Sequence, residues 1–311
     1  MADRTFALLK ILRVMLSVLA VPLLAWVVYR NWDKFTVVAE TPITTFLWIG
    51  AVTLVSLIAN SFRLRVAAAL FDAKLTPTEA FLVASTNTFF NVVTPMKGGI
   101  AVKGMYLHEV HGMSWPGYAG SLLVTQILAS SLSIGLALII LAAFGVLPPF
   151  IVLSVAALCA LLAILMWRQR DWIRTRLLRG RHFDGAGDRF ASIARNRPAL
   201  LLFAVAHIVF LLCITTRLFL VFTVFVPEIA FWQVLLIQSV LTGALFVSLT
   251  PGNIGVQEGL VAVAGTFLAI ATASAVLASL AERAFVLLTA LPVGGLCSIP
   301  VMRRIRDASR P

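Results

Sequence analysis

Two stretches break an otherwise apolar chain: TPMKGG at residues 94–99 and TPGNIG at residues 250–255. One lies in each half of the 311-residue sequence, and in each the proline is followed by glycine four positions later. Charged residues follow closely, Lys103 in the first half and Glu258 in the second. Unwound backbone is tolerated at membrane depth only beside protein or a polar cavity, so paired breaks in two halves point to a transporter's binding site. Translocation is therefore the first hypothesis.

The composition is that of an integral membrane protein. Hydrophobic residues make up 60% of the chain and charged residues only 12%, which excludes an ordinary soluble domain. A helix that spans about 30 Å of hydrocarbon takes roughly 20 apolar residues. The first apolar stretch lacks a cleavage site of the Ala-x-Ala kind, so we expect it to be retained as a span. Full spans are expected near residues 11–29, 43–61, 117–146, 149–167, 199–226 and 274–301.

Positive charge is concentrated in one long connection and at the C-terminus. Residues 168–198 hold nine arginines against three aspartates, and four more arginines follow residue 302. Positive charge near helix ends marks the cytoplasmic side, which places both termini in the cytoplasm. The net charge of +12 does not indicate nucleic acid, because these segments orient the protein and contact anionic lipid.

The two interrupted regions are expected to form re-entrant hairpins. The sequence TPTE at residues 76–79 matches a helix N-cap, so a helix begins at Pro77 and must end near Thr94. Its length of roughly 25 Å is short for a complete crossing. With the basic loop inside, the first hairpin opens to the cytoplasm and the hairpin at residues 229–272 opens to the outside. A simple crossing by residues 259–272 remains an alternative.

The sequence thus predicts an all-α polytopic protein with six full spans plus two oppositely oriented re-entrant hairpins, arranged as an inverted repeat. It forms a single transmembrane domain. The first half covers about residues 8–167, a cytoplasmic basic loop covers residues 168–198, and the second half covers about residues 199–302.

Residues at the first break suit a phosphate group. Lys97 and Lys103 flank the break, and a buried ammonium should face a cavity, a carboxylate or an anionic ligand. If the helix restarts near Ile100, the amides of Gly98 and Gly99 point free N–H groups at the same space. In the alternative interpretation, both lysines snorkel to the cytoplasmic surface.

Other polar residues near this break are open to two interpretations. Asn87 and Asn91 share one face of the preceding helix, where either a polar cavity or interhelical hydrogen bonds would satisfy them. His108 and His111 flank Glu109 beyond the helix. A metal site is conceivable there, but a hydrated turn at the interface accounts for these residues, and no metal is predicted.

The second break carries the ionisable residues of the other half. Glu258 sits in the first turn after it, where the helix dipole favours a carboxylate and a capping role suffices. The functional alternatives are a salt bridge to Lys103 or Arg283, or proton uptake during a transport cycle. Glu282 and Arg283 lie roughly 15 Å into the last span and point about 100° apart, so each needs its own partner. Arg217 is expected near the outer surface, where snorkelling suffices.

The predicted sites follow from these arguments. Arg283 can bind a phosphate through two hydrogen bonds, and Glu258 and Glu282 are assigned to gating or proton coupling. The predicted substrate-binding residues are Asn87, Asn91, Pro95, Lys97, Gly98, Gly99, Lys103, Pro251, Gly252, Asn253, Gly255, Glu258 and Arg283.

The motifs Pro95-x-x-x-Gly99 with Lys103, and Pro251-Gly252-x-x-Gly255-x-x-Glu258-Gly259, resemble the flippase-like transmembrane domain of lysylphosphatidylglycerol synthases. The resemblance covers about residues 8–302 and implies a protein of the bacterial inner membrane. It does not extend to the aminoacyl transferase domain, so synthesis of the lipid is not implied. The family usually has an acidic residue where Ile100 stands and arginine in place of Lys103, so fewer fixed charges line this site.

Residues and resemblance together predict a translocase for an anionic or glycosylated lipid, whose phosphate binds at the midplane between the two hairpins. No cofactor is expected, and no Asp-x-Asp, nucleophile or phosphate-loop motif indicates an enzyme. The alternative function is a non-transporting lipid-binding or scaffolding partner of a lipid-modifying enzyme, docked through the basic loop. A homo-oligomer or a lipid-synthesis enzyme is the expected protein partner, and anionic lipids are expected at the basic loop.

Overall fold

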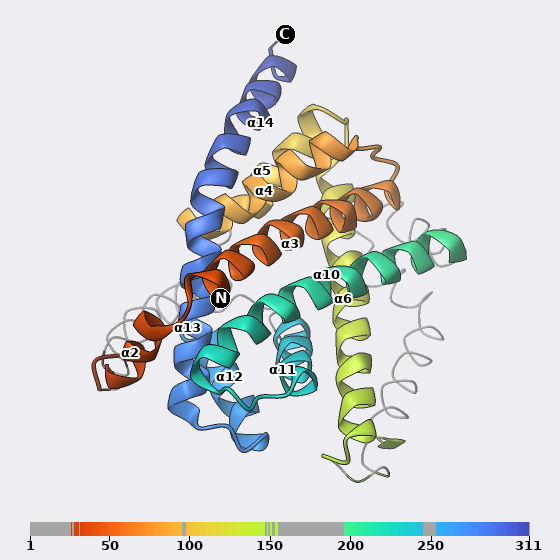
Figure 1. Cartoon of the computed structure of the whole chain (residues 1–311). Coiled ribbons are helices and arrows are strands. Elements are labelled where there is room, and N and C mark those ends of the chain that lie inside the picture. Colours follow the sequence, from red (N-terminus) through yellow and green to blue (C-terminus); the bar gives the residue numbers. More distant parts are fainter. Residues whose placement is uncertain are drawn as a thin grey trace, which may run out of the picture.

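The computed structural model describes residues 32–94, 98–146, 196–244 and 253–310, with isolated positions at 26, 28–30, 148, 150, 153 and 154. Every regular element within these residues is a helix (Figure 1). Among the described residues, four helical segments are long and apolar enough to cross a membrane. They are α3 (Ile43–Ala69), α6 (Trp115–Ala143), α10 (Arg197–Phe225) and the continuous run of α13 (Thr272–Thr289), the π-helix η2 (Ala290–Gly294) and α14 (Gly295–Ala308).

These four segments confirm the helices expected near residues 43–61, 117–146, 199–226 and 274–301. Most of the expected spans at 11–29 and 149–167 and most of the basic loop lie outside the described residues. The count of six spans and the opposite orientation of the hairpins stay predictions.

Shorter helices form where the interrupted regions were expected. The helix expected from Pro77 to about Thr94 is confirmed, because the Thr76 hydroxyl accepts a hydrogen bond from the Glu79 amide and the helix ends at Val93. The short helices are α2 (Asp33–Glu40), α4 (Pro77–Val93), α5 (Gly98–Glu109), α11 (Phe231–Ala244) and α12 (Val256–Phe267).

The bounds of α5 correct the sequence interpretation. The helix starts at Gly98, earlier than the restart expected near Ile100, and it includes His108 and Glu109. The stop signal is Gly112, which has a φ of +67°. Its amide donates to the His108 carbonyl at 2.9 Å, the bond of an αL cap, and the Met113 amide donates to the Leu107 carbonyl at 3.0 Å. Glycine adopts this left-handed conformation without a steric penalty, so the helix continues until glycine permits the turn.

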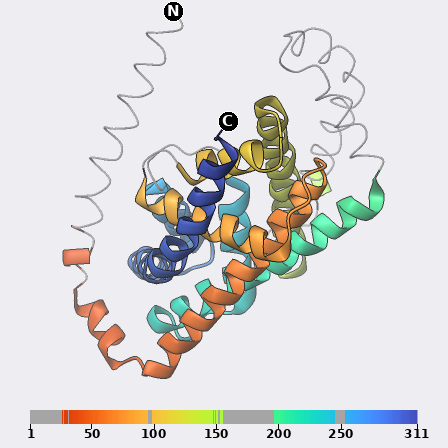
Figure 2. The same ribbon diagram turned by 90° about the horizontal axis from the view of Figure 1, so that it is seen from above.

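The long helices pack in an order that mixes the two halves of the chain. Helix α3 runs beside α10, α6 packs against α11, and α4 contacts α3, α5, η2 and α14 (Figure 1). Seen from above, α3 and α10 lie along one side, with α4, α5 and α14 on the same flank of this pair (Figure 2). One apolar core joins α10–α13 to the end of α6, and a second joins α4, α5 and α14 to α6.

Helix α4 and the π-helix touch almost backbone to backbone. A Cβ atom added to Gly294 would lie 2.5 Å from the Cβ of Phe89 and 2.8 Å from the carbonyl oxygen of Ser85. Both distances are far inside van der Waals contact, so glycine is required for this crossing.

A carboxylate clasp ties α4 to α5 and α14 at one end of the molecule. The Tyr106 hydroxyl and the Arg304 guanidinium each reach Glu79 Oε1 at 3.1 Å, while the Thr76 amide donates to Oε2 at 2.9 Å. Burial raises the pKa of Glu79, but the hydrogen bonds from Thr76 and Tyr106 and the proximity of His111 outweigh it and hold this pKa below its usual value. The ionised carboxylate therefore stabilises the folded state.

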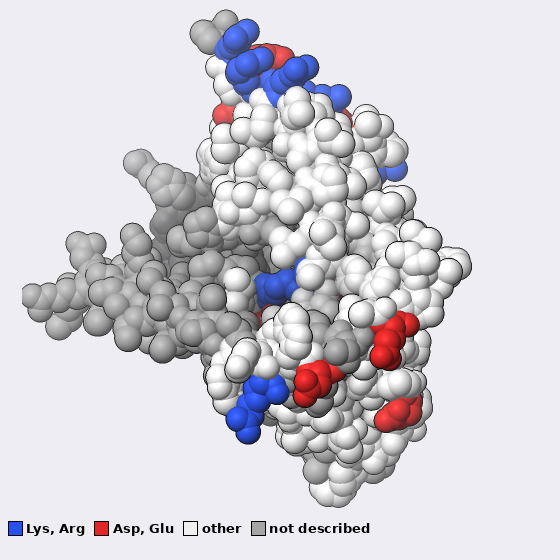
Figure 3. Space-filling model, turned by 60° about the vertical axis from the view of Figure 1, so that its left-hand side comes forward, with Lys and Arg blue, Asp and Glu red and all other residues white. Residues whose placement is uncertain are grey.

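Charge on the visible surface is concentrated toward the two ends of the long axis. Figure 3 shows mainly basic residues at the end occupied by the C-terminal part of α14, acidic residues with one further basic group toward the opposite end, and a mostly uncharged band between them. Basic side-chain surface also appears in a recess within this band. Charges at the two ends and a mostly uncharged middle are the distribution expected for a bilayer-spanning protein.

Candidate functional site

Helix α13 carries two adjacent ionisable residues, and each pairs with a different helix. Glu282 accepts from Arg217 on α10, with the arginine Nε 3.0 Å from the carboxylate Oε1 and a second contact from Nη2. The exposed fractions of these side chains are 12% for Arg217 and 8% for Glu282. Arg217 Nη1 also donates to the Ser56 hydroxyl on α3 at 3.3 Å. The expectation that Glu282 and its neighbour need separate partners is confirmed.

Arg283 forms the second buried ion pair, with Glu258 at the start of α12. The guanidinium reaches Glu258 Oε1 at 2.9 Å from Nη2 and at 3.0 Å from Nε, and the carboxylate side chain is only 2% exposed. Arg283 Nη2 also lies 3.3 Å from the Gln257 side-chain oxygen and 3.5 Å from the Asn253 carbonyl. Of the two salt-bridge partners considered for Glu258, Arg283 is therefore the one observed.

The local backbone explains how Glu258 is held. Gly255 has a φ of +81° and Asn253 a φ of +55°, two of the few positive values among the described residues. This conformation points the Gly255 amide at the carboxylate, and the Gly255 N to Glu258 Oε2 distance is 2.7 Å. Glu258 is both a helix-capping group and an ion-pair partner, so the two interpretations of this residue hold together.

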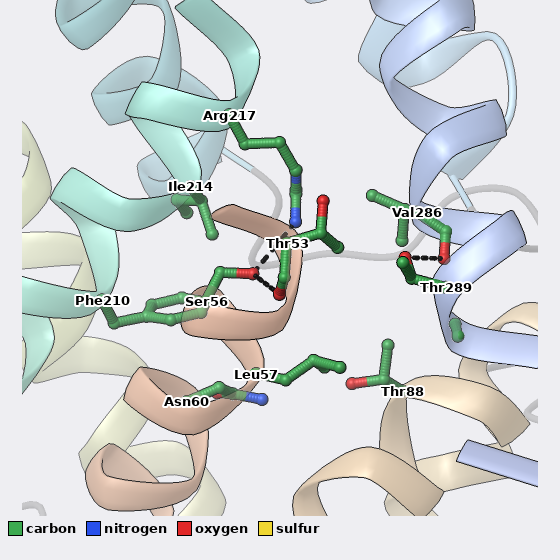
Figure 4. Close-up of a pocket in the computed structure, with 11 residues that line it drawn as sticks. Thr53, Ser56, Leu57, Asn60, Thr88, Phe210, Ile214, Arg217, Val286 and Thr289 are labelled. Carbon is green, nitrogen blue, oxygen red and sulfur yellow. Dashed lines mark hydrogen bonds between the residues drawn. The ribbon is translucent and has the colours of Figure 1, made fainter. Parts of the chain in front are cut away.

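A cavity of about 150 Å³ lies beside the first ion pair, between α3, α4, α10 and the α13–η2 junction (Figure 4). Most of its polar atoms are hydroxyls that donate to carbonyls of their own helices, so their oxygens remain able to accept. The Arg217 side chain extends from α10 toward Ser56 on one side of the cavity. The lining residues are Thr53, Ser56, Leu57, Asn60, Thr88, Phe210, Ile214, Arg217, Val286, Thr289 and Ala290.

The expectation that snorkelling accounts for Arg217 was wrong. This residue lies about 12 Å from the end of α10, close enough for snorkelling, yet it is almost fully buried because Glu282 and Ser56 engage it. The sequence held a missed signal for this site. Thr53, Ser56 and Asn60 recur at helical spacing and form a polar stripe on an apolar helix.

The first break is described only in part, because Pro95 and Lys97 lie outside the described residues, as do Pro251 and Gly252 at the second. Gly98 opens α5, and a Cβ atom on Gly99 would overlap the Asn87 carbonyl and lie 2.8 Å from the Asn91 side-chain oxygen. Helices α4 and α5 therefore cross at backbone distance.

Asn87 and Asn91 come close to the start of α5, as their shared face suggested. Within the described part of the chain, the buried side-chain oxygen of each has no hydrogen-bond partner. Such atoms are exceptions in proteins and mark places where water or a ligand completes the hydrogen bonding. Lys103, the remaining polar residue of this break, is half-buried with its ammonium 5.8 Å from the centre of the Tyr118 ring.

The histidines near the end of α5 are engaged in local contacts. His108 Nδ1 lies 2.8 Å from the Met113 carbonyl oxygen, and His111 Nε2 lies 3.9 Å from Glu79. Across the described ranges, no group of three or more histidine, cysteine or acidic residues could hold a metal ion.

Long apolar helices, short interrupted helices and buried ion pairs inside the bundle define a polytopic membrane protein built around a polar interior. The family model of the lysylphosphatidylglycerol synthase TM region matches residues 11–294, and the chain belongs to this family. The resemblance to lysylphosphatidylglycerol synthases is thereby confirmed, and the protein is a membrane protein of a lipid-related family. A search of curated proteins found no significant match.

Proposed function

We propose that the protein is a flippase-like translocase that moves the head group of an anionic or glycosylated lipid across the membrane. The observation that carries the proposal is the cavity beside Arg217 and Glu282, because helices from both halves of the chain form its walls. Its hydroxyl and amide lining suits a polar head group, while acyl chains would remain in the bilayer. Membership in a lipid-related membrane family supports the same function.

Binding and release would work by exchange of ion-pair partners. Both Arg217 and Arg283 are held by glutamates, so an incoming phosphate competes with a carboxylate for each guanidinium. Protonation of Glu258 would release Arg283 and also weaken the contact with the Gly255 amide. In this mechanism Glu258 and Glu282 act as gates, and no covalent reaction is catalysed.

The surroundings follow from the family and the charge pattern. We infer a bacterial inner-membrane location with both termini cytoplasmic and the basic loop on anionic lipid. A homo-oligomer or an enzyme of lipid synthesis is the proposed protein partner.

A reconstitution experiment tests the proposal. The full chain and its variants are placed in liposomes with fluorescently labelled lipid, and the exposed fraction is followed by quenching. Glu258→Gln and Arg283→Ala should slow lipid movement by about tenfold or more, because each removes a charge-assisted hydrogen bond from the exchange. Glu109→Gln removes an exposed carboxylate and should move lipid like the wild type.

The result that would overturn the proposal is wild-type transport by folded Glu258→Gln and Arg283→Ala proteins. If the wild type itself moves no lipid but still binds it, the scaffolding function is favoured. Deleting most of residues 170–195 then separates the two functions, because a docked partner needs the basic loop whereas a translocase does not.

A further inference from the structure

Two cations inside the bundle have no acidic partner. Arg63 on α3 and Lys103 on α5 are both half-buried, and within the described ranges neither forms an ion pair with a carboxylate. They lie close enough for the positive charge of Arg63 to repel that of Lys103. Like charges gathered in apolar surroundings cost free energy unless an anion joins them.

The contacts of these cations orient them without neutralising them. Arg63 Nη2 donates to the Asn60 side-chain oxygen at 2.9 Å, and its guanidinium lies 4.3 Å from the centre of the Phe210 ring. The Lys103 ammonium lies over the face of Tyr118. Amide oxygens and aromatic faces attract cations but carry no net charge. Most of the five Arg63 N–H groups thus remain available to an acceptor.

The other two arginines in the apolar interior provide the contrast. Arg217 and Arg283 each pair with a glutamate whose side chain is at most 8% exposed. The protein therefore supplies an internal counter-ion where it holds a single arginine, and it supplies none among the described residues where it brings arginine and lysine together. An external anion accounts for that difference.

We propose that Arg63 and Lys103 bind the phosphate group of a phospholipid at the edge of the cavity. Asn60 and Phe210, which hold the Arg63 guanidinium, also line the cavity, so the phosphate position and the cavity share a wall. A guanidinium with free parallel N–H groups binds phosphate oxygens in pairs, and an ammonium adds a point charge. Hydroxyls of the head group would enter the cavity, whose oxygens accept hydrogen bonds.

The size of the cavity supports a head group rather than a whole ligand. Pockets for drug-sized molecules enclose roughly 300–1,000 Å³. The cavity of about 150 Å³ is large enough for a small hydroxylated group joined to the phosphate. The inference deepens the proposed function by giving the phosphate a position, but its test measures binding and does not require translocation.

The test compares lipid binding by the purified full chain in detergent. Phosphatidylglycerol, diacylglycerol with the same acyl chains, and inorganic phosphate are titrated separately, and bound lipid is counted by native mass spectrometry. The wild type should bind phosphatidylglycerol at least tenfold more tightly than diacylglycerol, and Arg63→Gln or Lys103→Gln should each remove about tenfold of that preference. Arg303→Gln removes an exposed positive charge on α14 and should leave the preference unchanged.

The proposal would be overturned if both glutamine variants preferred phosphatidylglycerol over diacylglycerol as strongly as the wild type does. Inorganic phosphate that binds through Arg63 and Lys103 without competing with phosphatidylglycerol would assign the site to a soluble anion and overturn the lipid assignment. If the glutamine variants do not fold, Arg63→Lys keeps the charge while losing the paired donors, and the wild-type melting temperature gives a second measure. Phosphatidylglycerol that raises this temperature no more than diacylglycerol does would also refute the site.

Failure of the two proposals can be distinguished. If the wild type does not transport lipid but still binds phosphatidylglycerol more tightly than diacylglycerol, the translocase is rejected and the phosphate site is kept. If the wild type transports lipid but binds the two lipids equally well, the phosphate site is rejected and the translocase is kept.

Discussion

Breaking the buried ion pair between Arg217 and Glu282 should produce a large loss of stability. Replacing Arg217 by methionine leaves the Glu282 carboxylate, only 8% exposed, without its two guanidinium contacts. Removal of one member of a buried pair typically costs about 3–5 kcal/mol. Arg217→Met also removes the hydrogen bond donated to Ser56.

Each single variant leaves one charge of the pair without its counter-ion in apolar surroundings, so each should lose about 3–5 kcal/mol. In Glu282→Met the remaining arginine stays charged and keeps only the hydrogen bond to the Ser56 hydroxyl.

The assay is unfolding of the purified protein in mixed micelles at pH 7, carried out for both single variants and for the double variant. Apolar replacement of both partners is often neutral, so Arg217→Met with Glu282→Met should recover most of the stability. Arg303→Met on the exposed face of α14 should change stability by no more than about 0.5 kcal/mol. Single losses below 1 kcal/mol that add in the double variant would refute the reasoning.

Three further predictions concern the backbone and the clasp. Gly255→Ala forces alanine to a φ of +81° and should cost about 1–2 kcal/mol in the same unfolding assay, whereas Gly259→Ala, which meets open space, should not destabilise. Gly99→Ala drives a methyl group into the α4 backbone and should cost about 1–3 kcal/mol, whereas Gly50→Ala in an uncrowded helix position should cost nothing. The wild-type melting temperature should fall as the pH drops below about 4.5, the usual value for glutamate, because the lowered pKa of Glu79 contributes stability above that pH and loses it as the folded carboxylate is protonated. Glu79→Gln should melt lower at neutral pH and show a smaller acid-induced fall, and a fall as steep as that of the wild type would contradict this assignment.

Local chemistry made part of this protein predictable. The Thr76 cap and the glycine and proline breaks are encoded within a few residues, and the structure begins and ends α4 where they indicate. The divergence of Glu282 and Arg283 follows from helix geometry alone, and so did the need for separate partners.

Other features depend on how distant helices meet. The cavity needs α3, α4, α10 and α13 to come together, and nothing in the spacing of residues fixes which faces meet. Arg217 was assigned to the surface from its distance along α10, but burial is set by the helices packed around it. The recurrence of Thr53, Ser56 and Asn60 could have revealed the polar face of α3, although not its partners.

The contact of Gly294 with Ser85 and Phe89 is the point about which a tilt of α4 would turn. These residues lie near the middle of the helix, so a tilt about the contact moves its two ends in opposite directions. One end carries Glu79 in the clasp to α5 and α14, and the other leads into the first break. A tilt that displaces the break would therefore also displace Glu79 at the other end of α4 and strain the clasp to α5 and α14.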